Sequence, residues 1–277
     1  MGTEYYDVKS FVKKWKAEIK KEVDDGIASG HKRPSLTIVQ IGDNPASNKY
    51  VDNKIKDCKE VGIFVDLYRI PEGSYIDQGG LNNLVYNCET DGIIIQLPVP
   101  EGLKPIDALW YTDPKKDVDG FMPGSGYVPA TTLGIMKFLD NVGLGDGSKK
   151  NALVIGRSLI VGKPTARQLL DRNWTVEIAH SRTENLWKHF AGKHLIVSAV
   201  GRHGVVDLRQ VPAGCTVIDV GINFVDGKMV GDCAHADEAV NVKVTPVPGG
   251  VGLLTRAALL ENVVKAWKAQ WEPEKEW

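Results

Sequence analysis

The 277-residue sequence has no long hydrophobic run, no closely spaced cysteine pair and almost no net charge. No run is long enough to cross a bilayer, and the N-terminal segment lacks the apolar core of a signal peptide. Acidic and basic residues are interspersed and give a formal net charge of -1, which does not favour nucleic acid or a membrane surface as the main partner. We therefore expect a cytoplasmic protein that acts on a small molecule.

Cysteine and histidine are both scarce and dispersed. The four cysteines contain no Cys-x-x-Cys pair, and the six histidines do not cluster. Because zinc sites and disulfide frameworks need recurrent short spacings, we interpret the cysteines as free thiols in a reducing compartment. The sequence predicts no metal site; the thiols concerned are Cys58, Cys88, Cys215 and Cys233.

Short apolar segments rich in β-formers alternate with helical patterns along the whole chain, which predicts α/β units with parallel sheets. The length exceeds one ordinary core, so two such domains are expected. The predicted strands lie near Leu36–Gln40, Phe64–Arg69, Gly92–Gln96, Ala152–Ile155, Thr175–Ala179, Leu195–Ser198 and Thr216–Asp219. A helix over about Thr132–Asn141 separates the two series, and a last helix over about Leu254–Gln270 ends the pattern.

One helical segment between the first two strands carries an unusual set of polar side chains. Ser47, Tyr50 and Lys54 are three and four residues apart, so a helix beginning near Pro45 presents them on one face. A hydroxyl, an aromatic ring and an amine in one row favour a ligand-lining face, on which a partly buried lysine can exchange a proton. On these residues alone, a solvated helix face with a chance lysine stays the alternative.

The second series opens with a strand, a Gly-rich turn and a helix, in the segment ALVIGRSLIVGKPTARQLL. Gly156 permits the tight turn, Gly162 allows the helix to approach the strand, and Ser158 stands where a second glycine is usual in dinucleotide-binding turns. The pattern predicts a Rossmann-like dinucleotide-binding domain. An ordinary strand-to-helix turn is the alternative.

The end of the following strand bears on the choice of cofactor. An enzyme that uses NAD places an acidic residue there, whereas this chain has His180, Ser181, Arg182 and Thr183. Arg157 adds a second guanidinium nearby, and this combination suits a 2'-phosphate. We predict NADP as the cofactor, with solvated loop residues as the alternative.

A series of motifs in a fixed order resembles the methylenetetrahydrofolate dehydrogenase/cyclohydrolase family over nearly the whole chain. The motifs are ASNKYVDNKIKDCKEVGI, DGIIIQLPVP, PKKDVDG, PATTLGI, GRSLIVGKP, HSRT, VIDVGIN and TPVPGGVG. The resemblance implies oxidation of 5,10-methylenetetrahydrofolate with NADP, followed by hydrolysis of the methenyl product to 10-formyltetrahydrofolate. It also implies a homodimer and an active-site cleft between the two domains. The expected domains are a folate-binding, catalytic domain of residues 1–120 plus 252–277 and an NADP-binding domain of residues 121–251.

By this resemblance, Lys54 is the catalytic lysine, Gln96 hydrogen-bonds it, Tyr50 stacks on the pterin and Asp119 holds the pterin's N-H donors. Taken alone, Asp117 and Asp119 would more often be turn formers. The expected substrate-binding residues are Ser47, Tyr50, Asp119, Pro248, Gly249 and Gly250. The expected cofactor-binding residues are Gly156, Arg157, Ser158, Gly162, His180, Ser181, Arg182, Thr183 and Ile222.

The chain departs from the family pattern in three places, none of which involves the lysine, the glutamine, the tyrosine or the carboxylate. Met122 follows Phe121 where the family has histidine, and the loop to Val128 is short. The other departures are Cys233 and Ala234 after Gly231-Asp232, and Leu253-Leu254 in place of Pro-Met.

Two further classes of function stay open from the sequence. One is an NADP dehydrogenase for another substrate, with Lys54 as proton donor to a carbonyl; the other is a nucleotide-binding sensor without catalysis. Gln96 and Asp119 favour folate over a simple hydroxy acid, for which a paired arginine is expected. A proton-transfer group argues against a pure sensor.

Overall fold

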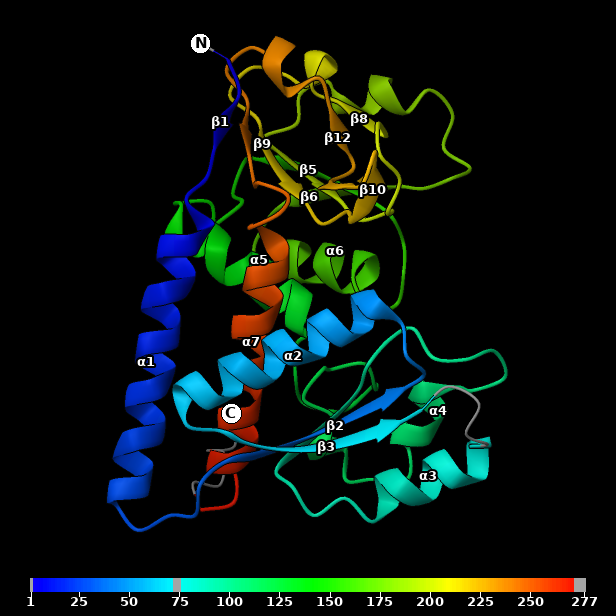
Figure 1. Ribbon diagram of the computed structural model, residues 1–277. Coiled ribbons are helices and arrows are strands. Elements are labelled where there is room, and N and C mark those ends of the chain that lie inside the picture. Colours follow the sequence, from blue (N-terminus) through cyan, green and yellow to red (C-terminus); the bar gives the residue numbers. More distant parts are fainter. Residues whose placement is uncertain (1, 72–75, 272–277) are drawn as a thin grey trace. The chain divides into compact units, whose positions relative to one another are not determined.

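The computed structural model describes residues 2–71 and 76–271. The chain forms two compact units, one made of Met1–Lys13 with Thr131–Thr255 and the other of Lys14–Ala130 with Arg256–Trp277. We name them by their sheets, the six-stranded unit and the three-stranded unit (Figure 1). These compact units are not the same as the folate-binding and NADP-binding domains predicted from the sequence. Residues 272–277 of the predicted catalytic domain lie outside the described residues.

The three-stranded unit has a parallel sheet in the order β3-β2-β4. The strands are β2 (Ser35–Ile41), β3 (Phe64–Ile70) and β4 (Gly92–Ile95). The central strand β2 is buried along nearly its whole length, as are all four residues of β4. Because helices cover both faces of such a sheet, these strands appear in the sequence as continuous apolar runs.

Helices surround this sheet, and α2 packs on β2 and β3 (Figure 1). They are α1 (Val8–Ala28), α2 (Pro45–Val61), α3 (Gln78–Tyr86), α4 (Pro105–Leu109), the short 3-10 helix η1 (Pro114–Lys116) and α7 (Val251–Lys268). The first residues of α1 and α7 belong to the six-stranded unit. Asp77 caps α3 by accepting the backbone N-H of Gly80 at 2.8 Å, which satisfies a donor that the helix itself leaves unpaired.

The six-stranded unit has an all-parallel sheet in the order β1-β13-β9-β7-β5-β6. In that order the strands are Glu4–Tyr5, Lys243–Val244, Thr216–Asp219, Leu195–Ser198, Asn151–Ile155 and Thr175–Ala179. The helices are α5 (Ala130–Asn141), α6 (Gly162–Leu170), η2 (Leu186–Phe190), η3 (Leu208–Gln210) and η4 (Ala236–Glu238). Two small strand pairs complete it, β8 (Val206–Asp207) with β12 (Cys233–Ala234) and β10 (Asn223–Val225) with β11 (Lys228–Val230).

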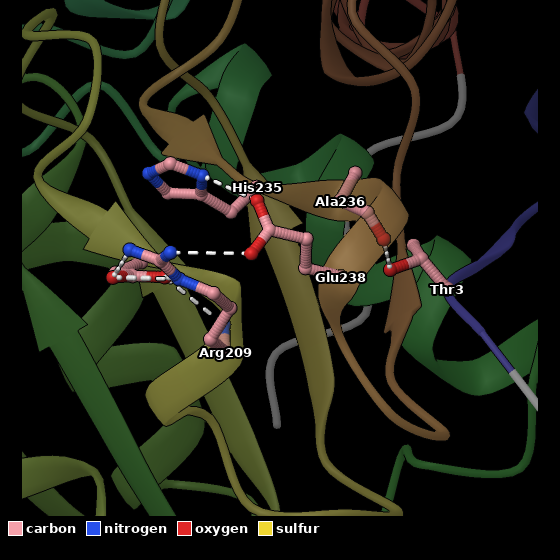
Figure 2. A network of polar contacts seen from close by, with 6 residues as sticks. Thr3, Arg209, His235, Ala236 and Glu238 are labelled. Atoms are coloured by element: carbon pink, nitrogen blue, oxygen red, sulfur yellow. Dashed lines mark hydrogen bonds and ion pairs between the residues drawn. The ribbon is translucent and has the colours of Figure 1, made fainter.

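A polar network joins the short helices η3 and η4 at the surface of this unit. Arg209 pairs with Glu238 at 3.2 Å, and Glu238 also contacts His235 at 3.1 Å. Figure 2 shows these side chains turned toward one another. Thr3 donates its hydroxyl to the carbonyl of Ala236 in the same view, which connects the N-terminal segment to η4. Exposed ion pairs of this kind each contribute little, about 0.2–1 kcal/mol, so the network mainly fixes local geometry.

The fold class predicted from the sequence is confirmed: two α/β units with parallel sheets, one of them Rossmann-like. Each predicted strand lies within one residue of the observed strand at either end. The last helix begins at Val251, three residues before its predicted start. The four cysteines are free, and no described helix is long and apolar enough to cross a membrane.

Candidate active site

The lysine and glutamine singled out in the sequence are hydrogen-bonded to each other in the three-stranded unit. The ammonium nitrogen of Lys54, on α2, donates to Oε1 of Gln96 at 3.0 Å. Gln96 follows the last residue of β4, and its own amide donates to the carbonyl of Leu97 at 2.7 Å. Since its backbone N-H also continues the ladder to Val39, at 2.8 Å, Gln96 is fixed at both ends.

Charge and burial act in opposite directions on the lysine. Burial lowers the pKa of Lys54 because it penalises the ammonium form, while the carboxylate of Asp119 partly restores it. Burial likewise raises the pKa of Asp119, and Lys54 opposes that shift. The two groups therefore form an electrostatically coupled acid and base, which is an arrangement suited to proton transfer.

Asp117 builds the turn that presents Asp119. It is fully buried, and its Oδ2 accepts the backbone N-H of Met122 at 2.6 Å. Burial raises the pKa of Asp117 to about 6, against the effect of backbone N-H groups that point at it. The turn-forming role expected for an isolated aspartate thus falls to Asp117, whereas Asp119 interacts with the lysine.

Asn262 holds the same turn from the last helix, and it was not identified from the sequence. Its side-chain amide donates to the carbonyl of Val118 at 2.8 Å and to that of Val128 at 3.3 Å. It is buried on α7 among apolar neighbours. A lone asparagine on an otherwise apolar helix face was the available signal, because a buried amide must be paired.

Tyr50 and Ser47 lie on the same helix as Lys54. Burial raises the pKa of Tyr50, so its phenol stays protonated across the physiological range. Ser47 is buried, and its backbone N-H donates to the side chain of Asn44 at 3.2 Å at the beginning of the helix. Tyr50, Lys54, Gln96 and Asp119 all belong to the three-stranded unit.

A cavity of about 790 Å³ lies at the carboxyl ends of β2 and β4 in this unit. Its lining includes Gly42, Asp43 and Pro98–Pro100. The cavity adjoins the end of β4, after which Gln96 follows. Tyr50, Lys54 and Gln96 are not among its lining residues, so the cavity is distinct from the contact between Lys54 and Gln96.

The Gly-rich turn after β5 has the close backbone approach that the sequence predicted. Gly156 has φ +117°, and a Cβ there would lie 2.6 Å from the carbonyl oxygen of Ala199. A Cβ on Gly162, the first residue of α6, would collide with the carbonyl of Gly156. Glycine is therefore required at both positions, because it lets the backbone of this turn pack closely against Ala199 and against the start of α6.

Ser158 bonds the backbone that leads into helix α6. Its hydroxyl oxygen accepts the backbone N-H groups of Val161 and Gly162, both at 3.2 Å, and its carbonyl accepts that of Lys163 at 3.0 Å. Ser158 therefore stabilises the helix start at the position where a second glycine is usual.

The segment after β6 forms a tight turn that exposes its basic and hydroxyl side chains. Thr183 accepts the backbone N-H of His180 at 2.9 Å, and the ring of His180 accepts that of Arg182 at 3.2 Å. Strands β5 and β6 pair in register up to Ile155 and Ala179, so both turns begin at the same edge of the sheet. Arg157, Ser181 and Arg182 are exposed there.

Two further segments of the six-stranded unit contain predicted site residues. Gly249 has φ +99°, and a Cβ on Gly250 would collide with the carbonyl of Pro246, so this loop also requires glycine. Ile222 lies just after β9 and is exposed. Asp232 lies in the same unit and is fully buried, although the sequence analysis did not identify it as a functional residue.

The buried carboxylate of Asp232 organises the loop after β7. It accepts the hydroxyl of Ser198 at 2.8 Å and the backbone N-H groups of Val200 and Arg202 at 3.0 and 2.8 Å. The side-chain amide of Asn223 donates to it as well, at 3.2 Å, and four donors on one carboxylate explain how it can be buried without a cation. The altered Gly231–Ala234 segment therefore has a structural role at this edge.

The fold and these residues define a class: a nucleotide-binding α/β enzyme in which a lysine is hydrogen-bonded to a glutamine at the end of a strand. Residues 6–119 match the family described as tetrahydrofolate dehydrogenase/cyclohydrolase, catalytic domain, and residues 129–271 match its NAD(P)-binding domain. The chain therefore belongs to the bifunctional methylenetetrahydrofolate dehydrogenase/cyclohydrolase family, which confirms the resemblance found in its motifs.

Individual relatives agree with this assignment. The chain is 40% identical to the bifunctional protein FolD of Sulfurihydrogenibium sp. (strain YO3AOP1), over 95% of this chain and 96% of the relative. The crystal structure of the bifunctional FolD enzyme from Campylobacter jejuni superposes with TM-score 0.90 at 36% identity, covering 97% of this chain and 99% of that one. The FolD enzyme of Trypanosoma brucei, solved with NADP and an inhibitor, has TM-score 0.89 and 27% identity over 98% of this chain and 99% of its own.

Proposed function

We propose that this chain oxidises 5,10-methylenetetrahydrofolate with NADP and then hydrolyses the methenyl product to 10-formyltetrahydrofolate. Family membership and the bifunctional FolD relatives support both activities. The observation that carries the proposal is the 3.0 Å hydrogen bond from Lys54 to Gln96, with Asp119 close enough to affect the charge of the lysine.

We assign the hydrolytic proton transfer to Lys54. Water adds to the carbon of the cationic methenyl group through a new C-O bond and gives up one proton. As the formyl C=O forms, one C-N bond breaks and the second proton of the water passes to the departing nitrogen, so one proton is released in total. The lowered pKa of Lys54 increases the fraction of neutral amine near neutral pH, and this amine can accept that proton. Gln96 holds the amine by its side-chain oxygen, which restricts the directions in which the amine can point.

Substrate binding is assigned to Tyr50 and Asp119 together with Ser47 and the loop Pro248–Gly250. A carboxylate can accept two adjacent N-H donors of a pterin, and a protonated phenol ring offers a flat apolar face for stacking. Burial keeps the Tyr50 phenol protonated, which supports its role. The glycines of the loop allow a ligand to approach the backbone.

The residues of the six-stranded unit fit a dinucleotide. The required glycines at 156 and 162 form a tight turn into the start of α6, where backbone N-H groups can bind a pyrophosphate, and Arg157, Ser181 and Arg182 are exposed at the same sheet edge. When bound, NADP supplies the hydride acceptor for the oxidation. We assign the pyrophosphate and 2'-phosphate contacts to Gly156, Ser158, Gly162 and the basic turn residues, and contacts with the remaining part of the cofactor to Ile222. The Trypanosoma brucei relative, solved with NADP, supports NADP as the cofactor.

An absorbance assay with methylenetetrahydrofolate and NADP tests the two activities, because methenyl-folate appearance and decay can be followed together. We expect Lys54→Met to lower the hydrolysis rate by about a hundredfold to ten-thousandfold, the usual contribution of general acid-base assistance. Hydride transfer should be retained in part, because it requires positioning more than a proton acceptor. An unchanged cyclohydrolase rate in this variant would refute the assignment of Lys54.

Cofactor selectivity has its own test. Charge-assisted bonds to a 2'-phosphate are worth about 1.5–3 kcal/mol each, so kcat/KM should be clearly higher with NADP than with NAD. Replacing Arg157 and Arg182 together by alanine should weaken NADP more than NAD. Arg167→Ala is a matched control, because Arg167 is an exposed arginine of α6 that pairs only with Asp171 in the described contacts. Equal efficiency of the wild-type protein with both cofactors would contradict the assignment.

Domain roles and assembly follow from the same proposal. We assign folate binding and catalysis to residues 1–120 with 252–277 and NADP binding to residues 121–251, in a cytoplasmic homodimer. Exposed apolar side chains on the β10–β11 hairpin, Phe224 at 63% and Val225 at 41% exposure, support a self-association surface on the six-stranded unit. Light scattering at assay concentration should give the dimer mass; a monomer would refute this part.

A further inference from the structure

Helix α2 has a buried carboxylate one turn beyond the lysine. Asp57 follows Lys54 by three residues and Tyr50 by seven, so the three side chains share one face of the helix. Only 6% of Asp57 is exposed. A carboxylate at such a depth must be paired, because an isolated buried charge is too costly to persist.

Two cations from different helices pair with this carboxylate. The amine of Lys16, on α1, lies 2.9 Å from Oδ1, and Nε of Arg256, on α7, lies 3.0 Å from Oδ2. Both cations are largely buried, with side-chain exposures of 12% and 18%. We call the three residues Lys16, Asp57 and Arg256 the Asp57 clasp; all of them belong to the three-stranded unit.

The clasp differs from the exposed ion pairs of the same unit. Lys20 and Asp24 on α1 are 2.8 Å apart, but their side chains are 50% and 56% exposed and lie on a single helix. Such a pair is screened by solvent and restrains nothing outside its own helix. In the clasp, each carboxylate oxygen is bonded to a different neighbouring helix, so α2 is tied to α1 and α7 at one point.

Arg256 also acts electrostatically on Tyr50. Its positive charge lowers the pKa of Tyr50, against the effect of burial, so its guanidinium lies within electrostatic range of the phenol as well as bonding Asp57. Glu60 binds Lys16 as a second acid, which leaves the whole cluster without net charge. The cluster therefore holds α2 without adding charge beside the lysine.

We propose that Asp57, held between Lys16 and Arg256, is a positioning residue that sets where Tyr50 and Lys54 stand. This inference rests on the function proposed above. The bond from Lys54 to Gln96 joins α2 to the end of β4, so a small rotation or shift of α2 alters that contact directly. Displacements of about 1 Å can cost on the order of a hundredfold in rate. A clasp that merely stabilises the fold would instead leave the kinetic constants of the folded protein unchanged.

The test measures both reactions on Asp57→Asn, Arg256→Met, Arg256→Lys and the double variant Asp57→Asn/Arg256→Met, with Lys20→Met as the matched control. Circular dichroism sets an assay temperature at which every protein is folded, and NADP binding by fluorescence checks the nucleotide site independently. We expect Arg256→Met and Asp57→Asn to lower the cyclohydrolase kcat by about ten- to hundredfold, with KM for the methenyl folate changing less than threefold. The NADP dissociation constant should stay within twofold of wild type.

Two comparisons separate positioning from simple stabilisation. The double variant should be no slower than the worse single variant, because both substitutions break one connection. Arg256→Lys keeps a cation at this position and should recover most of the rate lost in Arg256→Met; it also carries the test if the other variants do not fold. Wild-type kinetic constants in the folded variants, losses that multiply in the double variant, or a Lys variant as slow as the Met variant would each overturn the inference. An inactive wild-type protein would instead overturn the proposed function and this inference with it.

Discussion

The hydrogen bond between Lys54 and Gln96 makes a quantitative prediction about how the two activities can be separated. Gln96→Leu removes the oxygen that accepts the lysine N-H at 3.0 Å and the amide that donates to Leu97 at 2.7 Å. A hydrogen bond between neutral groups is worth about 0.5–1.5 kcal/mol, and about 1.4 kcal/mol corresponds to a factor of ten in rate. If this bond orients the neutral amine for proton transfer, the cyclohydrolase rate should fall by roughly two- to tenfold.

A second substitution at the same position changes charge while keeping an acceptor. Gln96→Glu places a carboxylate beside Lys54, which favours the ammonium form and raises the pKa of the lysine. Hydrolysis needs the neutral amine, so the rising limb of its pH-rate profile should move to higher pH. The leucine variant should lower the plateau instead.

The assay follows methenyl-folate decay for hydrolysis and its formation with NADP for the dehydrogenase, on the same preparations. Gln78→Leu is a suitable control, because Gln78 is also half-buried and uses both ends of its amide, but it bonds Asn82 and the backbone of Lys104 and no lysine amine. The dehydrogenase rate should fall by less than the cyclohydrolase rate in Gln96→Leu. Equal losses in both activities, or an unshifted profile in Gln96→Glu, would refute the proton-transfer role of this contact.

Three further predictions concern stability and binding. Gly156→Ala should lower both Tm and NADP affinity, because the added Cβ would meet the carbonyl of Ala199. Gly192→Ala is the control: Gly192 also has positive φ but has no neighbour within 4 Å, so the substitution should lower the free energy of unfolding by only about 1 kcal/mol and leave NADP binding unchanged. Burial raises the pKa of Asp117 to about 6, above its unfolded value of about 3.9, so its favourable contribution to folding stability is complete below about pH 3.9 and is lost as the pH rises through 6. In urea unfolding, the free energy of unfolding of Asp117→Asn should therefore gain up to about 3 kcal/mol on that of wild type between pH 4 and pH 7. A difference that stays constant over this pH range would contradict the prediction. Asn262→Leu should destabilise the protein by about 2–4 kcal/mol in the same measurement, because it leaves two buried carbonyls without donors, and a neutral effect would show that this turn is held otherwise.

Much of the fold could be predicted because its central strands are short apolar runs between turn signals. Strands β2 and β5 are buried on both faces, so they appear in the sequence as continuous apolar runs that are easily identified as central strands. The two-residue strands β1 and β13 could not be found in this way, since their pairing depends on the sheet edge that the rest of the unit provides. The β10–β11 hairpin had a signal that was missed: Asp226-Gly227, both at positive φ, is a typical two-residue hairpin turn.

Some residues of the candidate active site could also be identified from local sequence, whereas others depend on the folded chain. Ser47, Tyr50 and Lys54 follow from helical spacing, and Gln96 is conspicuous because it ends a strand of isoleucines. The roles of Asp117 and Asn262 depend on which backbone groups a folded turn brings to them, and no local pattern encodes this. Ion pairs such as those of Asp57 join residues 41 and 199 positions apart in the chain, so only the folded chain shows them.

The register of β5 and β6 has a consequence for how cofactor preference can change over evolutionary time. The paired ladder ends at Ile155 and Ala179, immediately before the two turns that contain the basic residues. Substitutions at Arg157, Ser181 and Arg182 therefore alter exposed side chains without altering any strand pair or core contact. On the proposed assignment of these residues to the 2'-phosphate, a descendant of this chain can exchange one nicotinamide cofactor for the other through a few surface changes, while the sheet that positions them is inherited intact.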